Sequence, residues 1–155
     1  MGTVLFYHLT RHSPAEVVQR LTLRTLETGG RVMLRGQDRA VLDRLDQWLW
    51  LHPEDGFLPH GMEGGPQDAD QPLLIGQGAA VNGAKVLMLM GGMSVNPQEA
   101  QSMDRVCLMF EDADPAQVQA ARNEWRAVTA AGLVAEYWAD ASGRWEKKAE
   151  SGAKG

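Results

Sequence analysis

The sequence predicts an α/β fold, a three-layer Rossmann-like sandwich with a mostly parallel central sheet and helices on both faces. Short, solid apolar runs recur along the chain, which is typical of strands buried on both faces. Segments with helical capping signals alternate with these runs, and right-handed crossovers would place those helices on both sides of the sheet. With 155 residues, 44% of them hydrophobic, the chain can form one packed domain, which we expect over residues 1–145.

The first third of the chain shows the alternation clearly. Residues 3–8 are an apolar run and predict the first strand. A helix is expected over residues 14–27, because Ser13 can cap it, a proline holds its first position and Glu16 completes a capping box. Two glycines end this helix, and residues 31–35 predict the second strand.

Asp38 can cap a second helix, which is expected to end at His52 before a proline. Its apolar residues recur with helical spacing, at Val41, Leu42, Leu45, Trp48 and Leu49. Residues 53–72 are rich in Gly, Pro and Asp and predict a long surface loop. Loops of this length in compact domains tend to carry function.

The second half continues the pattern. Further strands are expected at residues 73–75, 86–90, 105–110 and 133–138. Asn96 and Asp114 are each followed by proline and each predict a helix start, and Gly132 ends the longer second helix. Residues 146–155 are polar, and we expect them to form a flexible tail.

Composition excludes several classes of function. Lys and Arg total 15 against 20 for Asp and Glu, a net charge of −5, which disfavours a direct grip on nucleic-acid phosphates. The single cysteine, Cys107, excludes a disulfide framework, and its apolar neighbours indicate a buried residue. No apolar run approaches the roughly 18 residues of a membrane helix, and no signal segment precedes the first strand, so we expect a cytoplasmic protein.

Motifs for catalysis or cofactors are weak. The turn at residues 9–13 after the first strand has no glycine, whereas a phosphate cradle requires glycines there. Residues 76–81 form only a broken Gly-rich pattern, and the four histidines do not have metal-ligand spacing. We therefore expect no cofactor, no metal site and no catalysis by this chain. A nucleotide-dependent enzyme on a Rossmann-like fold is the alternative function.

Tryptophan is abundant, with five residues. Trp50 lies about 200° around its helix from Trp48, so the two cannot share one face. Trp50 leads into the loop with Phe57, Pro59 and His60, which indicates either a surface pocket or a ring tucked under its own loop.

The last helix offers a second candidate surface. Val118, Arg122 and Trp125 lie at i, i+4 and i+7 on one stripe, with Arg126 beside them. Two interpretations are open at this point. Either Trp125 is a core residue with Arg122 at its edge, or an arginine beside aromatic rings forms a site for an apolar residue next to a carboxylate.

Residues 45–60 resemble the chi subunit family of bacterial DNA polymerase III, in which the pattern L-D-x-x-L-W precedes a proline and then S/G-F-x-P-H. Residues 3–9 resemble the first strand of that family. Residues 121–132 are similar to its late helix, A-R-x-x-Y/W-K/R followed by A-G. The resemblance covers nearly the whole chain in the same order.

This resemblance implies a non-catalytic replication subunit that links the clamp loader to single-stranded DNA-binding protein by binding its acidic, Phe-ended C-terminal tail. DNA would then be reached only indirectly. The residues that match the tail-binding motifs are Trp50, Phe57, Pro59, His60, Val118, Arg122, Trp125 and Arg126. We expect Trp50 and Trp125 to form a slot for the terminal ring, with Arg122 on the carboxylate. The family often has Tyr in place of Trp125, so a hydroxyl contact would be lost.

The family also implies a psi subunit on a different surface. The first strand and the helix at 14–27 are candidates, because they are far in sequence from the aromatic loop. The sequence leaves open whether psi exists in this organism, and it leaves the oligomeric state open.

Overall fold

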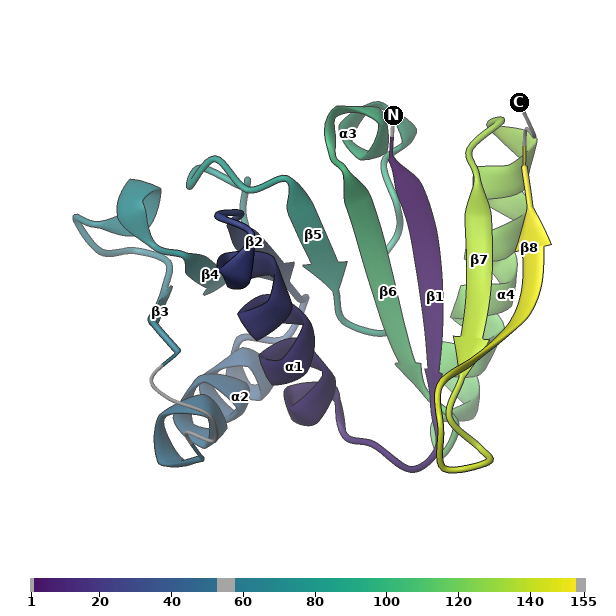
Figure 1. Ribbon diagram of the computed structural model, residues 1–155, viewed down its shortest axis with the longest axis horizontal. Coiled ribbons are helices and arrows are strands. Elements are labelled where there is room, and N and C mark those ends of the chain that lie inside the picture. The colour runs from purple at the N-terminus through teal and green to yellow at the C-terminus, as the bar shows by residue number, and fades with distance from the viewer. Residues whose placement is uncertain (1, 53–57, 153–155) are drawn as a thin grey trace.

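The computed structural model describes residues 2–52 and 58–152, and it contains one eight-stranded sheet (Figure 1). The strands are β1 (Thr3–Leu9), β2 (Val32–Arg35), β3 (His60–Met62), β4 (Leu73–Gly76), β5 (Val86–Leu89), β6 (Arg105–Glu111), β7 (Ala135–Ala139) and β8 (Glu146–Ser151). Their order is β3-β4-β2-β5-β6-β1-β7-β8, and every pair is parallel except β7–β8. The predictions of an α/β class and a mostly parallel sheet are confirmed.

Four α-helices accompany the sheet in the described residues. They are α1 (Pro14–Glu27), α2 (Arg39–Leu51), α3 (Pro97–Ser102) and α4 (Pro115–Ala130). Each begins at the residue that the sequence predicts as its cap, because a short polar side chain accepts a backbone N–H that the first helical turn leaves unpaired. The N-caps are Ser13, Asp38, Asn96 and Asp114. Ser13 and Glu16 form the complete capping box.

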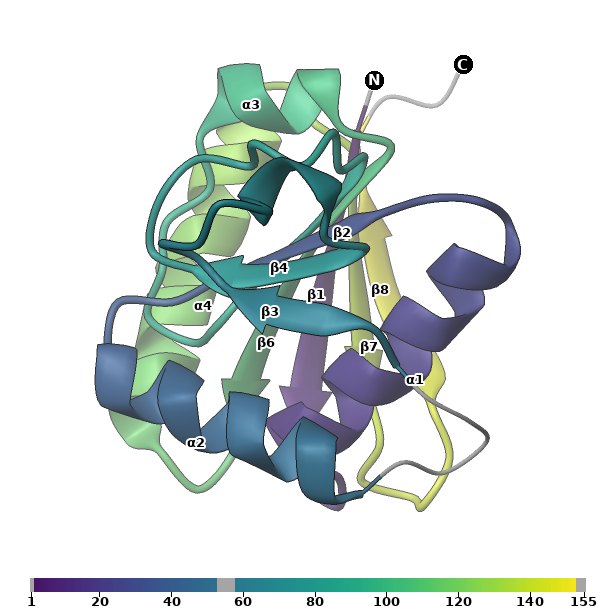
Figure 2. The ribbon, with the colours of Figure 1, turned by 90° about the vertical axis from the view of Figure 1, so that its left-hand side faces the viewer.

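The hydrophobic core is split between the two faces of the sheet, because successive residues of a strand point to opposite sides. Along β1, Val4 and Phe6 belong to the cluster that includes residues of α3 and α4. Leu9 of the same strand belongs to the other cluster, with residues of α1 and α2. Figure 2 shows α1 and α2 together on one side of the sheet, with α4 behind it.

Three elements differ from the prediction. Within the expected loop 53–72, the structure has the short strand β3, paired with β4, and a 3₁₀ turn, η1 (Asp68–Asp70). The expected flexible tail at 146–155 is wrong for residues 146–151, which form β8 against β7. This strand buries little, and its side chains include Lys147 and Glu150, 3.1 Å apart. Ladder hydrogen bonds rather than an apolar pattern hold it, so the usual sequence signal for a strand is missing.

Cys107 lies in the middle of β6 and is buried, as predicted. Burial raises the pKa of its thiol to about 12, so the reactive thiolate is scarce at neutral pH. Among the residues that the structure describes, no helix is long and apolar enough to cross a membrane.

Candidate functional site

A cavity of about 370 Å³ opens between α4 and the strands β1, β6, β7 and β8. From α4 it is lined by Val118, Arg122 and Trp125, which the sequence predicts as one stripe, and by Arg126, which it predicts beside them. The sheet and the inner side of the helix supply the rest of the lining, which consists of Phe6, His8, Phe110, Ala121, Tyr137 and Ala149. We call this space the α4 cavity.

Aromatic rings form the floor of the α4 cavity. Trp125 meets Phe6 edge to face with 5.3 Å between ring centroids, and Tyr137 with 6.3 Å. His8 stacks on Phe110 at 4.7 Å. Edge-to-face and offset stacked pairs fix ring positions, so the floor is preorganised for a further apolar or aromatic group. Trp125 is half-buried, and its ring packs on the core cluster and also lines the cavity.

The polar groups of the cavity lie around these rings. The His8 ring hydrogen-bonds through Nδ1 with the Tyr137 hydroxyl and through Nε2 with Asp112 at 2.8 Å. Burial raises the pKa of the Tyr137 hydroxyl, and the nearby positive charge of Arg122 partly offsets this rise. Tyr137 therefore stays neutral and can act as a hydrogen-bonding group at neutral pH.

Arg122 is exposed on α4 and makes no ion pair with any residue that the structure describes. Arg126, also exposed, makes one long hydrogen bond of 3.4 Å to the Asn123 side chain. An exposed guanidinium next to a cavity with an aromatic floor suits a ligand that joins an apolar group to a carboxylate.

Trp50 and His60 lie elsewhere in the molecule. The two rings pack against each other at 4.2 Å, and the buried His60 contacts Asp46 of α2 through Nε2 at 3.2 Å. Trp50 is 48% exposed, and Pro59 is half-buried one residue before β3. Phe57 lies outside the described residues.

The predicted slot between Trp50 and Trp125 is therefore wrong. α2 contacts β3 and β4, near one edge of the sheet, and packs on the cluster shared with α1. α4 contacts β6 and β7, near the other edge, and packs on the cluster of the opposite face. Figure 1 shows the two helices at opposite ends of the molecule. The eight predicted site residues thus do not form one site. The four on α4 line a cavity, and Trp50, Pro59 and His60 belong to a separate surface.

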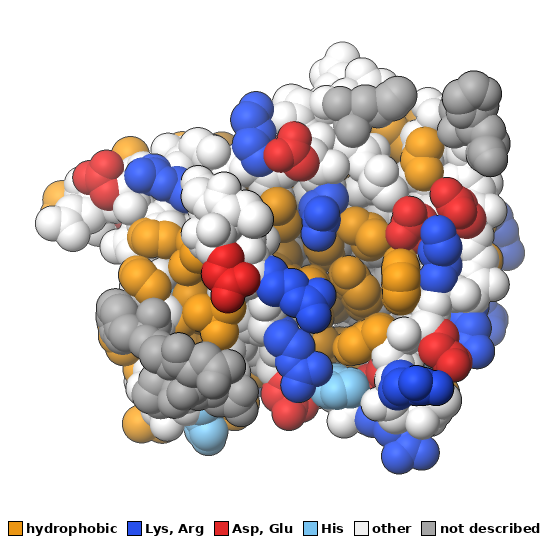
Figure 3. All heavy atoms as spheres, viewed as in Figure 1, with side chains coloured by type: hydrophobic (Ala, Val, Ile, Leu, Met, Phe, Trp, Pro, Cys, Tyr) orange, Lys and Arg blue, Asp and Glu red, His pale blue; other side chains and the backbone are white. Residues whose placement is uncertain are grey.

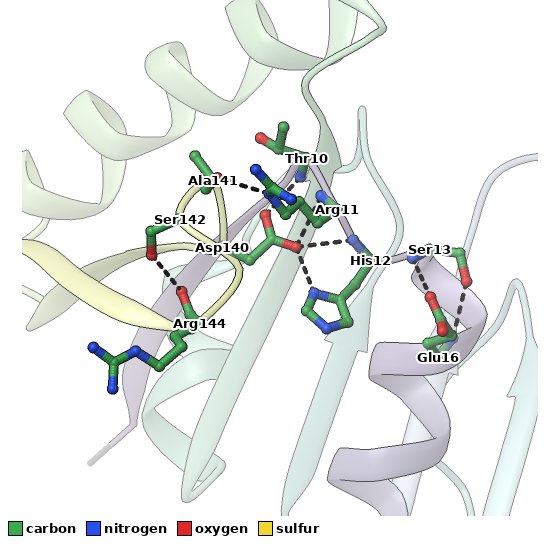
Figure 4. A network of polar contacts seen from close by, with 9 residues as sticks. All are labelled: Thr10, Arg11, His12, Ser13, Glu16, Asp140, Ala141, Ser142 and Arg144. Carbon is green, nitrogen blue, oxygen red and sulfur yellow. Dashed lines mark hydrogen bonds and ion pairs between the residues drawn. The ribbon is translucent and has the colours of Figure 1, made fainter.

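The turn after β1 has a feature that the sequence analysis missed. The carboxylate of Asp140, which directly follows β7, accepts the backbone N–H groups of Thr10, Arg11 and His12 at 2.7, 3.1 and 2.9 Å (Figure 4). The His12 ring adds a fourth hydrogen bond at 2.6 Å. Asp140 is fully buried. Burial alone would raise its pKa, but these hydrogen bonds outweigh burial and lower it, so Asp140 stays ionised.

This turn occupies the place where the parallel α/β folds that bind nucleotides hold a phosphate, between the end of the first strand and the first helix. Here an internal carboxylate takes the backbone donors that a phosphate would require. In the part of the chain that the structure describes, no group of three or more His, Cys, Asp or Glu residues is arranged to hold a metal ion.

The described residues thus combine an α/β fold with a cavity that has an aromatic floor and the exposed Arg122 in its lining. The chain belongs to the family of the DNA polymerase III chi subunit, HolC, whose model matches residues 1–136. It is also 28% identical over 129 residues to the DNA polymerase III subunit chi of Pseudomonas aeruginosa strain PAO1. The aligned region covers 81% of this chain and 88% of that protein. The resemblance found in the sequence is confirmed, and the chain is thus a member of a family of DNA replication accessory subunits.

Proposed function

We propose that this chain is a non-catalytic adaptor that acts in the cytoplasm and links the clamp loader to single-stranded DNA-binding protein. The α4 cavity would bind the acidic, Phe-ended C-terminal tail of that protein. One observation carries the proposal: the exposed Arg122 makes no ion pair within the described residues and lines the same cavity as Trp125.

The chemistry of the cavity matches such a tail. A terminal Phe ring would enter the cavity and pack against the exposed sides of the Trp125 and Tyr137 rings. The terminal carboxylate would meet Arg122, and acidic residues further up the tail would lie near Arg126. In a chain with a net charge of −5, these two arginines supply the local positive charge that an acidic tail requires.

Titration of a labelled peptide tests this proposal. A short acidic peptide that ends in Phe should bind at a micromolar level, about −8 kcal/mol. Arg122→Ala should weaken binding at least tenfold, because a charge-assisted hydrogen bond contributes about 1.5–3 kcal/mol. Arg44→Ala, an exposed arginine of α2, is the matched control and should bind as the wild type does.

The same peptide with an amidated C-terminus separates the carboxylate contact from general attraction. It should bind the wild type about as weakly as the acid peptide binds Arg122→Ala, and Arg122→Ala should weaken it little further. If amidation and Arg122→Ala each weaken binding and their effects on the binding free energy add fully, Arg122 does not hold the terminal carboxylate. Unchanged binding by Arg122→Ala would refute the site.

For the psi subunit we propose the surface at the end of α2. Leu51 is 72% exposed and adjoins the half-exposed Trp50, and large exposed apolar side chains that cluster are typical of protein interfaces. Leu51→Glu should abolish co-purification with a co-expressed psi subunit and leave tail binding at the α4 cavity unchanged. Retention of psi by Leu51→Glu would return the choice to β1 and α1.

The adaptor and the alternative, a nucleotide-dependent enzyme, predict different effects of nucleotides on the melting temperature. Because Asp140 occupies the backbone donors of the turn after β1, millimolar ATP or NAD should leave the melting temperature unchanged. A rise of several degrees would favour the alternative.

A further inference from the structure

A second groove, of about 480 Å³, lies on the other face of the sheet, between α1 and β7. Leu5 and Tyr7 of β1 form its floor, and Trp138 of β7 and Trp145 of the β7–β8 connection line its far side. Figure 3 shows this region as a hollow of apolar side chains bordered by a column of basic ones. We call it the α1/β7 groove. It shares no residue with the α4 cavity or with the surface of Trp50.

The groove exists because no helix of residues 2–52 and 58–152 covers one face of β1. β1 lies between two parallel neighbours, β6 and β7. Parallel strands are normally covered on both faces. On the α4 side, Val4 and Phe6 are 0% and 1% exposed, whereas Leu5 and Tyr7 on the groove side are only partly buried. On this face α1 and α2 lie to one side of β1 and leave it uncovered (Figure 1).

Three arginines without an ion-pair partner in the described residues border the groove. Arg20 and Arg24 lie one turn apart on α1, and Arg105 lies at the start of β6. All three are exposed, and none makes an ion pair with a described residue.

Of the three carboxylates at the groove, two are already engaged. Glu16 accepts the backbone N–H of Ser13 in the α1 cap, and Glu136 accepts the Trp138 indole N–H at 2.9 Å. The side chain of the third, Asp104, makes no hydrogen bond or ion pair with a described residue. The groove thus has as many carboxylates as arginines, but its three arginines are not paired with them and are left for the carboxylates of a partner.

We propose that the α1/β7 groove is a docking site for an amphipathic helix of a partner protein, with acidic residues along the edge of its apolar face. The groove has room for several side chains but not for a whole helix, so the helix would lie across its mouth. Its apolar side chains would reach Leu5 and Tyr7, and its carboxylates would meet the arginines of α1. This proposal does not depend on the proposed function.

A single-stranded nucleic acid fits the groove less well. Nucleic-acid channels expose flat ring faces for stacking. Here Tyr7 and Trp145 are engaged edge to face with each other at 5.2 Å, and the His12 ring stacks on Trp145 at 5.6 Å. The carboxylates of Glu136 and Asp104 would also repel a phosphate backbone, whereas an acidic helix can place its charges only where the arginines are.

The test is a selection from a phage-displayed library of 20-residue peptides with apolar residues fixed at i, i+3, i+4 and i+7 and all other positions random. Peptides are selected on the full chain and counter-selected on the triple variant Arg20→Glu, Arg24→Glu, Arg105→Glu. These side chains are exposed and unpaired, so the variant should melt like the wild type. A double variant, Arg39→Glu, Arg44→Glu, carries the same kind of charge change at exposed sites of α2, away from the groove.

The expected result is an acidic consensus that shifts the indole NMR signals of Trp138 and Trp145. Its affinity should fall at least tenfold on the groove variant and less than twofold on the control variant. The proposal is overturned if no peptide distinguishes the variants, or if the consensus is neutral or basic. It is equally overturned if a 20-nucleotide oligo-dT binds the wild type through the same arginines. Self-association of the chain that only the groove variant abolishes would assign the groove to a second copy instead.

Discussion

Replacement of Asp140 by Asn tests the most densely bonded polar residue of the described chain. Its Oδ2 accepts three hydrogen bonds, from the backbone N–H groups of Arg11 and His12 and from the His12 ring, and its Oδ1 accepts one from Thr10. The carboxylate thus joins the end of β7 to the turn that leads into α1. Asn has the same shape but only one acceptor oxygen, and it carries no charge.

The magnitude follows from this geometry. In either orientation of the amide, its NH₂ group faces at least one buried N–H donor, and an unsatisfied buried donor costs about 1–3 kcal/mol. The remaining bonds lose their charge-assisted part, about 1 kcal/mol for the set. We expect Asp140→Asn to lower the free energy of unfolding by about 2–4 kcal/mol. For a chain of this length, that corresponds to a melting temperature lower by roughly 5–15 °C.

Urea and thermal unfolding followed by circular dichroism measure this change, with an unchanged m-value showing that the denatured state is the same. Asp112→Asn is the matched control, because Asp112 also binds a histidine ring but its side chain is 56% exposed, so its loss should cost less than about 1 kcal/mol. If Asp140→Asn costs no more than Asp112→Asn, the buried carboxylate does not hold the turn, and the account of why this turn rejects phosphate also fails.

Four further outcomes are expected. Because the folded-state pKa of Asp140 is lowered, its stabilisation is complete above about pH 5, begins to fall near the ordinary pKa of about 4, and is lost as pH falls through the lowered folded-state pKa. The stability difference between wild type and Asp140→Asn should therefore shrink in acid, and urea titrations from pH 7 to pH 3 measure it. Cys107 should resist a thiol reagent in the native protein and react only at the rate of unfolding. Removal of residues 146–155 should weaken tail-peptide binding and lower the melting temperature by several degrees, because β8 covers the edge of β7 and lines the α4 cavity through Ala149. Trp50→Ala should leave tail-peptide binding unchanged in the titration described above, since it lies outside the α4 cavity.

Local chemistry made most of the fold predictable. A cap satisfies donors within its own first turn, so Ser13, Asp38, Asn96 and Asp114 identify their helices without knowledge of the rest of the chain. The central strands are solid apolar runs for an equally direct reason, since both of their faces are buried.

Elements at the edges of the sheet were harder to predict. β3 has only three residues and includes Gly61, and β8 presents charged side chains to solvent. Both are fixed by pairing with a neighbour, β4 or β7, and pairing partners leave no mark in the periodicity of a short polar segment. Asp140 was missed for a related reason, because its donors lie about 130 residues earlier in the chain.

The error over Trp50 and Trp125 has a topological cause. Helical periodicity places Val118, Arg122 and Trp125 on one stripe, but it does not say which face of the sheet a helix covers. The strand order decides this. From β2 the chain crosses through α2 towards the β3 edge, and from β6 it crosses through α4 in the opposite direction to β7. Since crossovers between parallel strands are right-handed, opposite directions place the two helices on opposite faces. In a chain with this strand order, side chains of α2 and α4 therefore have the sheet between them, and a ligand held by one helix cannot be enclosed by the other.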